Sequence, residues 1–265
     1  MELQGRYNEI QKQGLGLIAI SYDPPETLKR FAESRGITFP LISDGGSAII
    51  RRYGILNDQQ QPGTRGYGVP HPGTFIVDRR GIVTARFFED AYQERYTAAA
   101  ILAAQGARAG GASIAATTSH LSMSASISDA AVAPGERISI VIDVSPRPKI
   151  HVYAPGKHDY RIVRVGIDPQ SWMRVHETRY PRSEIYHFRP LNERVEVFSK
   201  PFRLVQDLTI LATPEAQRSL ATMSSVTIGG ALEYQACDDK VCYTPASVPF
   251  SFTIEMKTLD RRPPG

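Results

Sequence analysis

Cys237 and Cys242 are the two cysteines of this 265-residue chain, and their type and spacing suggest chemistry more clearly than any other residues do. An apolar strand-like run leads into Cys237, a polar turn follows, and Cys242 begins the return path. A hairpin of this kind can bring two Cα atoms within the roughly 4.4 to 6.8 Å that a disulfide requires. The spacing therefore favours a disulfide between these residues.

Such a pair has three alternative uses: a structural disulfide, a redox-active disulfide, or part of a metal site. A disulfide that closes so short a loop stabilises a fold by an amount near the low end of roughly 2 to 4 kcal/mol, and a pair on an exposed turn suits thiol exchange. Zinc ordinarily takes four ligands, and no other Cys or His lies close by in the sequence. We favour the redox-active pair and expect no metal and no cofactor.

The composition limits the classes of function. Hydrophobic residues make up 42% of the chain and charged residues 22%, which is typical of a globular protein with sizeable cores. The net charge is only +4, and Arg and Lys are scattered among acids, so we expect no nucleic-acid partner. No run approaches the roughly 18 apolar residues that span a bilayer, and the first residues lack an export-signal pattern. We expect neither a membrane span nor a signal peptide in these residues, and the oligomeric state stays open.

The chain is expected to fold as two domains. Residues 106–119 are small, polar or glycine-rich, and we interpret them as a linker. Residues 1–105 alternate strand-like and helix-like patterns, which predicts an α/β domain with a mixed sheet. Residues 120–258 contain short strand-like segments separated by Pro and Gly, which predicts an all-β sandwich. Residues 259–265 form a tail.

In the first half, helix-like and strand-like runs follow one another closely. Residues 16–21 form a continuous apolar run of the buried-strand type, and residues 26–35 predict a helix between proline and glycine signals. Residues 74–78 and 82–88 flank a hairpin turn. Residues 92–104 predict a final alanine-rich helix.

In the second half, one short run, residues 215–221, predicts a helix, and the other periodic runs predict strands. The strand-like runs are 138–144, 150–153, 161–167, 195–198, 202–205, 209–212, 226–228, 231–235 and 248–256.

Four stretches of the first half, residues 15–23, 36–44, 53–55 and 72–81, together resemble the peroxiredoxin or AhpC/TSA branch of the thioredoxin-like fold. They occur in the order in which that family has them. The resemblance implies a thioredoxin-like domain with an antioxidant ancestry, and it implies that Pro72 is a cis-proline beside the active site. An ordinary trans bond is the alternative, because the two forms of an X-Pro bond differ by only about 0.5 to 1 kcal/mol.

The departure from that family concerns the nucleophile. Thioredoxin-like redox proteins have a first strand that ends in a reactive cysteine at a helix N-terminus, where the helix dipole lowers the thiol pKa. No cysteine precedes Cys237, so we expect no peroxidase activity from the first half by itself. Either the polypeptide begins further upstream, which we favour, or the domain is a degenerate scaffold. The first explanation predicts a sheet edge that is prone to pair with another chain.

Three stretches of the second half, residues 149–156, 195–202 and 234–245, are similar to the N-terminal periplasmic domain of the thiol:disulfide interchange protein DsbD. The resemblance implies an immunoglobulin-like sandwich whose two cysteines lie on a hairpin. It further implies that they take electrons from a thioredoxin-like domain or protein and pass them to disulfide partners. On that basis Cys242 is the expected attacking sulfur and Cys237 its partner.

The same resemblance implies that aromatic side chains shield the disulfide. Phe198 is the candidate for a cap, and Tyr153 and Tyr234 are candidates for neighbours of the disulfide. Plain packing in the core is the alternative for each of them.

The two halves together favour a thiol-disulfide oxidoreductase that relays electrons through Cys237 and Cys242. A disulfide-based task suggests a periplasmic or other extracytoplasmic compartment, although the missing export signal points the other way. The alternative function is a non-enzymatic binding or assembly protein, with a static disulfide and a degenerate redoxin scaffold. A peroxidase that uses Cys237 is disfavoured, because no helix N-terminus is expected around that residue.

Overall fold

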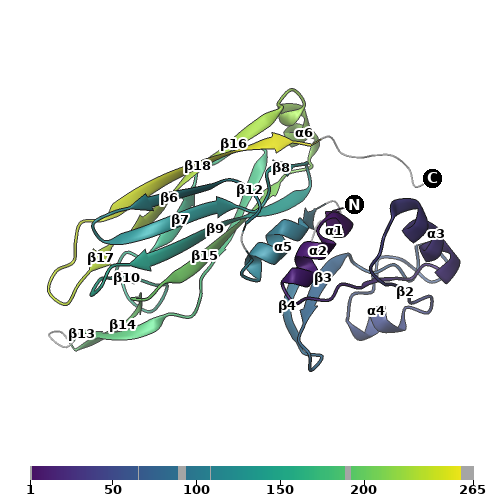
Figure 1. Ribbon diagram of the computed structural model, residues 1–265, viewed down its shortest axis with the longest axis horizontal. Helices are drawn as coiled ribbons and strands as arrows, with labels where there is room; N and C mark the ends of the chain where they lie inside the picture. Colours follow the sequence, from purple (N-terminus) through teal and green to yellow (C-terminus); the bar gives the residue numbers. More distant parts are fainter. Residues whose placement is uncertain (1, 65, 89–93, 108, 189–191, 258–265) are drawn as a thin grey trace. The chain divides into compact units, whose positions relative to one another are not determined.

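The computed structural model describes residues 2–64, 66–88, 94–107, 109–188 and 192–257. The chain forms two compact units, and the boundary between them lies between Ala98 and Ala99 (Figure 1). The expected tail, residues 259–265, lies outside the described residues. Within the described ranges, no helix has the length and apolar character needed to cross a membrane.

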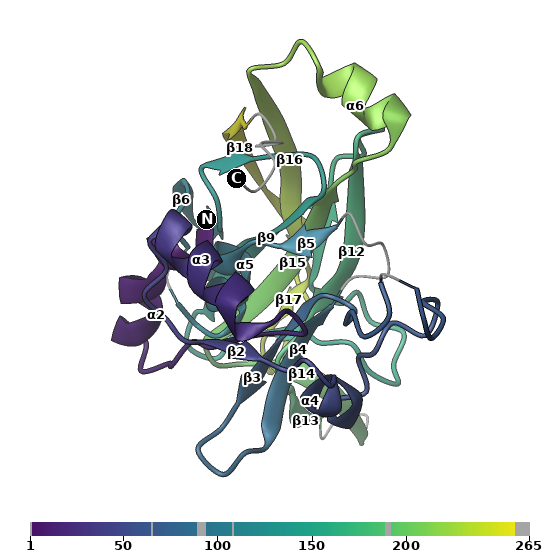
Figure 2. The same ribbon diagram turned by 90° about the vertical axis from the view of Figure 1, so that its right-hand side faces the viewer.

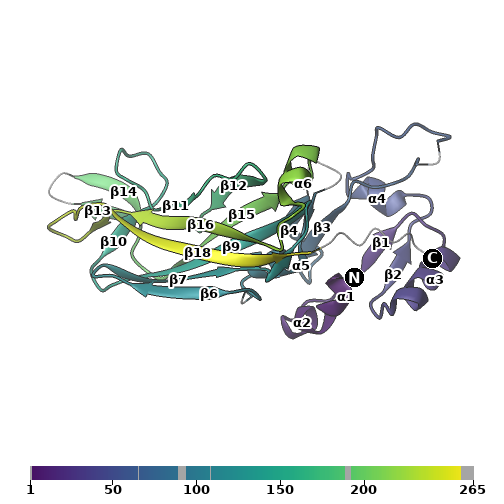
Figure 3. The ribbon, with the colours of Figure 1, turned by 90° about the horizontal axis from the view of Figure 1, so that it is seen from above.

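The first unit consists of short helices and two small sheets. In chain order its elements are α1 (Glu2–Gly5), α2 (Tyr7–Lys12), β1 (Ala19–Ser21), α3 (Pro25–Arg35), β2 (Leu41–Ser43), α4 (Ala48–Arg52), β3 (Gly73–Val77), β4 (Val83–Phe88) and β5 (Arg95–Tyr96). Strands β1 and β2 lie side by side and parallel (Figure 3). Strands β3 and β4 form the antiparallel hairpin that the sequence predicted.

The sheets of the first unit are less complete than the predicted mixed sheet. Among the described residues, β1 pairs with β2 and β3 pairs with β4, and no strand joins the two pairs. Packing is correspondingly light, since α3 has no fully buried residue and Phe31 on it is 37% exposed. Backbone N–H and C=O groups on the outer edges of such pairs are available to a further strand.

Pro72 follows a trans peptide bond, because the described residues contain no cis peptide bond. The expected cis-proline is therefore wrong. Pro70 forms a bridge with Leu56, and the backbone N–H of His71 donates to the carbonyl of Ile55. The chain thus enters β3 in an extended form, which suits the trans bond that X-Pro sequences prefer.

Among its described residues, the second unit contains three sheets and two short helices, α5 (Ala98–Ala104), which begins at the boundary, and α6 (Pro214–Leu220). The first sheet has the order β12 (Met173–Arg179), β15 (Phe202–Ile210), β9 (Glu136–Pro146), β7 (Leu121–Ile127) and β6 (Ser113–Thr117). The second has the order β11 (Arg164–Ile167), β16 (Ser225–Tyr234), β18 (Ala246–Met256) and β8 (Ala131–Val132). The third has the order β13 (Glu184–Phe188), β14 (Glu193–Phe198), β10 (His151–Tyr153) and β17 (Ala236–Cys237).

Two sequence predictions near the start of this unit differ from the structure. The expected linker, 106–119, contains β6, which pairs with β7 because Ile114 and Ala116 alternate toward the core. Small residues suit such a closely packed edge strand. The helix expected over 92–104 begins only at Ala98, since Arg95–Tyr96 form β5 and residues 92–93 lie outside the described residues.

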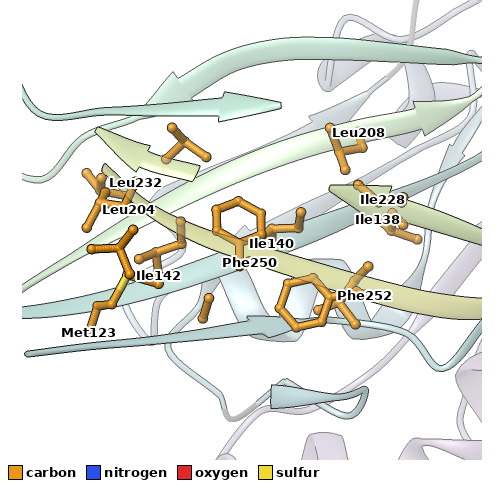
Figure 4. Packing of buried hydrophobic residues seen from close by; sticks show 14 of the residues in the cluster. Met123, Ile138, Ile140, Ile142, Leu204, Leu208, Ile228, Leu232, Phe250 and Phe252 are labelled. Carbon is orange, nitrogen blue, oxygen red and sulfur yellow. The ribbon is translucent and has the colours of Figure 1, made fainter. Parts of the chain in front are cut away.

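The main core fills the space between the first and second sheets. Alternate residues of β9 and β15 point into it and meet Ile228, Phe250 and Phe252 from β16 and β18 (Figure 4). Burying a side chain of this size contributes roughly 1.5 to 3 kcal/mol. The third sheet packs against this continuous apolar core.

The third sheet lies at one end of the second unit, and α6 lies at the opposite end (Figures 1 and 2). One face of the sheet contributes Val152, Phe198 and Ala236 to the main core. Because strand side chains alternate between faces, Tyr153 and Cys237 point to the other face, into a second, smaller cluster. The cysteine pair therefore lies on the side of this sheet that faces away from the main core.

Candidate functional site

Cys237 and Cys242 form a disulfide across a hairpin. Cys237 ends β17 and pairs with Cys242 through an isolated antiparallel bridge, with the two Cα atoms 4.1 Å apart. The backbone of β17 is held in turn by β10, where His151 is the register partner of Cys237. The disulfide is thus fixed to a sheet on one side and to a short turn on the other.

Asp238 holds the turn between the cysteines. Its Oδ1 accepts hydrogen bonds from the backbone N–H groups of Lys240 at 2.7 Å and Val241 at 2.8 Å. Its Oδ2 accepts a bond of 2.9 Å from the Tyr243 hydroxyl. These bonds stabilise the charged form and lower the pKa of the Asp238 carboxyl. These local polar contacts hold the hairpin turn in addition to the disulfide.

The two sulfur-bearing residues differ sharply in exposure. Cys237 is 1% exposed and belongs to the smaller apolar cluster, whereas Cys242 is exposed. A thiolate that attacks a disulfide must approach one sulfur along the S–S axis, and accessibility decides which sulfur it reaches. Cys242 is the residue that a partner in solution can reach.

Tyr153 contacts both sulfurs. Its hydroxyl oxygen lies 3.4 Å from Sγ of Cys237 and 3.4 Å from Sγ of Cys242. Since a disulfide carries no proton, the hydroxyl is the donor. Burial, together with the charge of Glu193, raises the pKa of Tyr153, so the hydroxyl keeps its proton at neutral pH.

A second tyrosine supports the first. The rings of Tyr153 and Tyr160 stack with centroids 4.3 Å apart and planes within 5°. The Tyr160 hydroxyl donates a hydrogen bond of 2.5 Å to Oε2 of Glu193. This bond to a carboxylate raises the pKa of Tyr160 to about 12. The stack and the bond fix the orientation of the Tyr153 ring beneath the disulfide.

A third tyrosine closes the opposite side. The Tyr186 hydroxyl donates a 2.7 Å hydrogen bond to Oδ1 of Asp239, and this raises its pKa to about 12. The ring of His151 lies 4.5 Å from the ring of Tyr186, centroid to centroid. Burial lowers the pKa of His151, against the opposing charges of Asp239 and Asp238, so the imidazole is neutral above pH 7.

These side chains surround a pocket of about 60 Å³ beside the disulfide. Its wall is largely aromatic: His151, Tyr153, Tyr160, Tyr186 and Phe188. Both cysteines also line it, with Glu193, Asp238 and Lys240 as its charged members. Among the described residues, no group of three or more His, Cys, Asp or Glu is arranged to hold a metal ion.

Two of the three expected aromatic neighbours lie elsewhere. Phe198 is buried in the main core, where it stacks on Phe202 with centroids 4.3 Å apart. Alternation along β14 points Phe198 to the face opposite Val195 and Val197. Tyr234 is likewise in the main core, and its hydroxyl lies 3.0 Å from Oγ1 of Thr118. Of the three, only Tyr153 contacts the disulfide.

The sequence prediction omitted Tyr160, Tyr186, Phe188 and Glu193. The run Glu184–Phe188 carries a usable signal, because alternation places Tyr186 and Phe188 on one face of a strand. Its register against β14, where Tyr186 faces Val195, could not be read from the sequence. Tyr160 lies in a loop and carries no periodic signal at all.

Comparison with known proteins concerns mainly the first unit. Residues 1–86 match the AhpC/TSA family. Alkyl hydroperoxide reductase E of Mycobacterium tuberculosis is 38% identical over 90 residues, which are 33% of this chain and 53% of that protein. Peroxiredoxin Bcp of Escherichia coli is 32% identical over 79 residues, which are 30% of this chain and 50% of that protein. The chain thus spans about half the length of the curated relatives it matches.

The family match supports a thioredoxin-like class for the first unit. Cys237 is the first cysteine of the chain, so the matched residues hold no thiol.

Solved structures with some likeness to this chain include two N-terminal domains. The N-terminal periplasmic domain of ScsB from Proteus mirabilis aligns with a TM-score of 0.38 and 13% identity, over 55% of this chain and 52% of that one. The DsbD N-terminal domain of Neisseria meningitidis, in its reduced form, aligns with a TM-score of 0.32 and 13% identity, over 44% of this chain and 78% of that one. At these scores the immunoglobulin-like assignment of the second unit stays a prediction.

Proposed function

We propose that the second unit is a thiol-disulfide exchange module, built as an immunoglobulin-like sandwich, in which Cys237 and Cys242 cycle between disulfide and dithiol. The observation that carries the proposal is the contrast between an exposed Cys242 and a buried Cys237 that share one tyrosine donor. A purely structural disulfide requires neither an accessible sulfur nor a hydroxyl directed at the S–S bond. An exchanging pair benefits from both.

The exchange begins at Cys242. A thiolate of the partner attacks Sγ of Cys242, a new S–S bond joins the two proteins, and Cys237 leaves with the electron pair of the broken bond and takes up a proton. A second thiolate of the partner then attacks the partner's own sulfur, and Cys242 leaves as a thiolate that is protonated in turn. Two electrons and two protons pass to this protein, and the partner's dithiol becomes a disulfide.

Tyr153 assists the departure of Cys237. As the S–S bond breaks, negative charge develops on Sγ of Cys237, which lies 3.4 Å from the Tyr153 hydroxyl. A hydrogen bond to a charged atom is stronger than one to a neutral atom. The hydrogen bond from Tyr153 to Sγ of Cys237 is therefore stronger in the transition state than in the intact disulfide. An interaction that strengthens in the transition state accelerates the reaction, here the cleavage of the S–S bond.

The proposed partner is a thioredoxin-like domain or protein with two thiols. The first unit holds no cysteine and cannot supply them from these residues. If the natural polypeptide extends upstream, a thioredoxin-like active site there is the proposed donor. Disulfide exchange of this kind is suited to an oxidising, extracytoplasmic compartment, which is the location we propose.

Trapping the mixed disulfide tests the assignment of the sulfurs. Cys237→Ser leaves Cys242 alone, and Cys242→Ser is the matched variant that leaves Cys237. The remaining cysteine of each variant reacts with 5,5′-dithiobis(2-nitrobenzoate), which leaves it as a mixed disulfide with thionitrobenzoate and releases a second thionitrobenzoate. The activated variant is then mixed with a thioredoxin-family protein that keeps only its attacking cysteine, and that cysteine displaces the bound thionitrobenzoate. We expect Cys237→Ser to form the covalent complex at least about tenfold faster. Equal rates, faster trapping through Cys237, or no complex with either variant would contradict the proposal.

A further inference from the structure

We infer that the pocket beside Cys242 receives a basic side chain, Arg or Lys, that flanks the attacking cysteine of the partner. This inference rests on the proposed function and adds the chemistry of the partner to it. Cys242 lines the pocket. A side chain next to a cysteine bonded to Cys242 is therefore within reach of the pocket.

The aromatic wall suits a cation. Tyr153, Tyr160, Tyr186 and Phe188 line the pocket with His151. The faces of such rings carry negative electrostatic potential and attract an ammonium or guanidinium within about 6 Å of the ring centre. The two outer hydroxyls, of Tyr160 and Tyr186, are already bonded to Glu193 and Asp239, so the rings are fixed in place before a partner arrives.

The charges favour the same ligand. Glu193 lies in the pocket wall, and the hydroxyl of Tyr160 holds its carboxylate there. Asp238 also lines the pocket, and Asp239 is bonded to a lining tyrosine. Lys240, which is exposed at the hairpin tip, opposes them, but the two lining carboxylates of Glu193 and Asp238 outnumber its single positive charge. With His151 neutral, the pocket keeps a net negative charge, which complements a basic side chain and repels an acidic one.

Thiol peptides with one variable neighbour test the inference. The blocked peptides Ala-Xaa-Cys-Ala-Gly and Ala-Ala-Cys-Xaa-Gly, with Xaa as Arg, Leu or Glu, are reacted with the oxidised full chain at one pH. The rate of mixed-disulfide formation is followed by acid quenching and mass spectrometry. A basic neighbour also lowers the pKa of the peptide thiol, so each rate is divided by that for the neutral disulfide bis(2-hydroxyethyl) disulfide.

After this correction we expect the Arg peptide of at least one series to react about fivefold faster than its Leu counterpart, and the Glu peptide to react slowest. Glu193→Gln should reduce the Arg-to-Leu ratio toward one. Glu196→Gln is the matched control, since Glu196 is on the same strand but does not line the pocket, and it should keep the ratio.

The outcomes separate this inference from the proposed function. If all peptides react at the same corrected rate, or Leu reacts fastest, the basic-ligand inference is overturned while disulfide exchange stands. If the Arg peptide reacts faster than the Leu peptide by the same factor in Glu193→Gln as in the parent protein, the basic side chain does not bind in this pocket. If no thiol reacts with the folded protein, the proposed function itself fails.

Discussion

The Tyr186 hydroxyl donates a 2.7 Å hydrogen bond to Oδ1 of Asp239, across 53 positions of sequence. This bond ties β13 to the turn of the cysteine hairpin. With its pKa raised to about 12, Tyr186 remains a donor throughout the neutral range. One contact between two side chains thus closes the aromatic wall beside the disulfide.

Tyr186→Phe should open that wall and expose the disulfide. The loss of one partly exposed hydrogen bond costs about 0.5 to 1 kcal/mol. We therefore expect 2-mercaptoethanol to reduce the disulfide about two- to fivefold faster in the variant, as measured by quenched alkylation and mass spectrometry. A rate equal to or below that of the parent would show that the bond does not limit access.

Tyr153→Phe should have the opposite effect. The variant keeps the ring and its stack on Tyr160 but removes the donor to the leaving sulfur. We expect attack on Cys242 to slow by about tenfold or more, since a bond to a developing charge is worth roughly 1.5 to 3 kcal/mol. The matched control is Tyr180→Phe, which loses a hydroxyl bonded to the carbonyl of Val163. Equal slowing in both variants would contradict a specific role for Tyr153.

Acid should loosen the cysteine hairpin through Asp238. Bonds from the N–H groups of Lys240 and Val241 hold the pKa of Asp238 below its ordinary value of 3.8. A carboxyl with a lowered folded-state pKa stabilises the fold above its unfolded-state pKa, and that stabilisation is lost as the pH falls through the folded-state pKa. Between about pH 6 and about pH 2.5, the free energy of unfolding should therefore fall less in Asp238→Asn than in the parent protein.

Urea unfolding at the two pH values measures this difference. Glu177→Gln removes an exposed carboxylate of β12 and serves as the control. Should Asp238→Asn and Glu177→Gln both follow the pH profile of the parent, the proposed role of the Asp238 carboxylate in the turn would be wrong.

A second pH effect arises in the first sheet of the same unit. Burial, with the nearby charge of Arg137, lowers the pKa of His176 to about 4, and its Nε2 lies 2.8 Å from Oγ1 of Thr209. Between about 6.5 and 4 the unfolded chain binds a proton that the folded chain does not, so stability falls as the pH falls. After allowance for solvent screening, we expect the free energy of unfolding to fall by about 1 to 2 kcal/mol over this pH range because of His176.

His176→Gln should remove most of that slope while it preserves the side-chain hydrogen bond. His187→Gln, at an exposed position of β13, is the control and should keep the slope. The readout is the free energy of unfolding in urea at several pH values. An unchanged slope in His176→Gln would assign the effect to other groups.

The sequence predicted most strands of the main core, because alternation is a local signal. It divided single strands wherever polar or flexible residues interrupt the pattern. Strand β16 was predicted as two runs, yet it continues through Gly229 and Gly230. A side chain on Gly229 would meet Asp168, and one on Gly230 would meet the carbonyl of Gly166 and the ring of Phe250. Strand β15 was also divided, because Asp207 looks like a surface residue. The fold buries it, with Ser139 and Arg179 as hydrogen-bond donors.

The site was predictable only in part for the same physical reason. The spacing of Cys237 and Cys242 was enough to predict the disulfide. Tyr153 was predicted because residues 149–156 resemble a segment of the DsbD N-terminal domain. Tyr186 and Glu193 reach the pocket through the register of β13 with β14 and the placement of β14 beside β10. Such non-local pairing has no signature in a single sequence, so an aromatic residue in the core and one in the pocket look alike.

The most direct test of the central claim is a redox titration of the folded, full chain. The protein is equilibrated in buffers of defined thiol-disulfide potential without denaturant, and the reduced fraction is measured by alkylation and mass spectrometry. We expect reversible, two-electron reduction of Cys237 and Cys242 at a potential between about −270 and −120 mV, in the range of exchange proteins. A disulfide that stays oxidised below about −300 mV until the protein unfolds would show that the pair is a static clip.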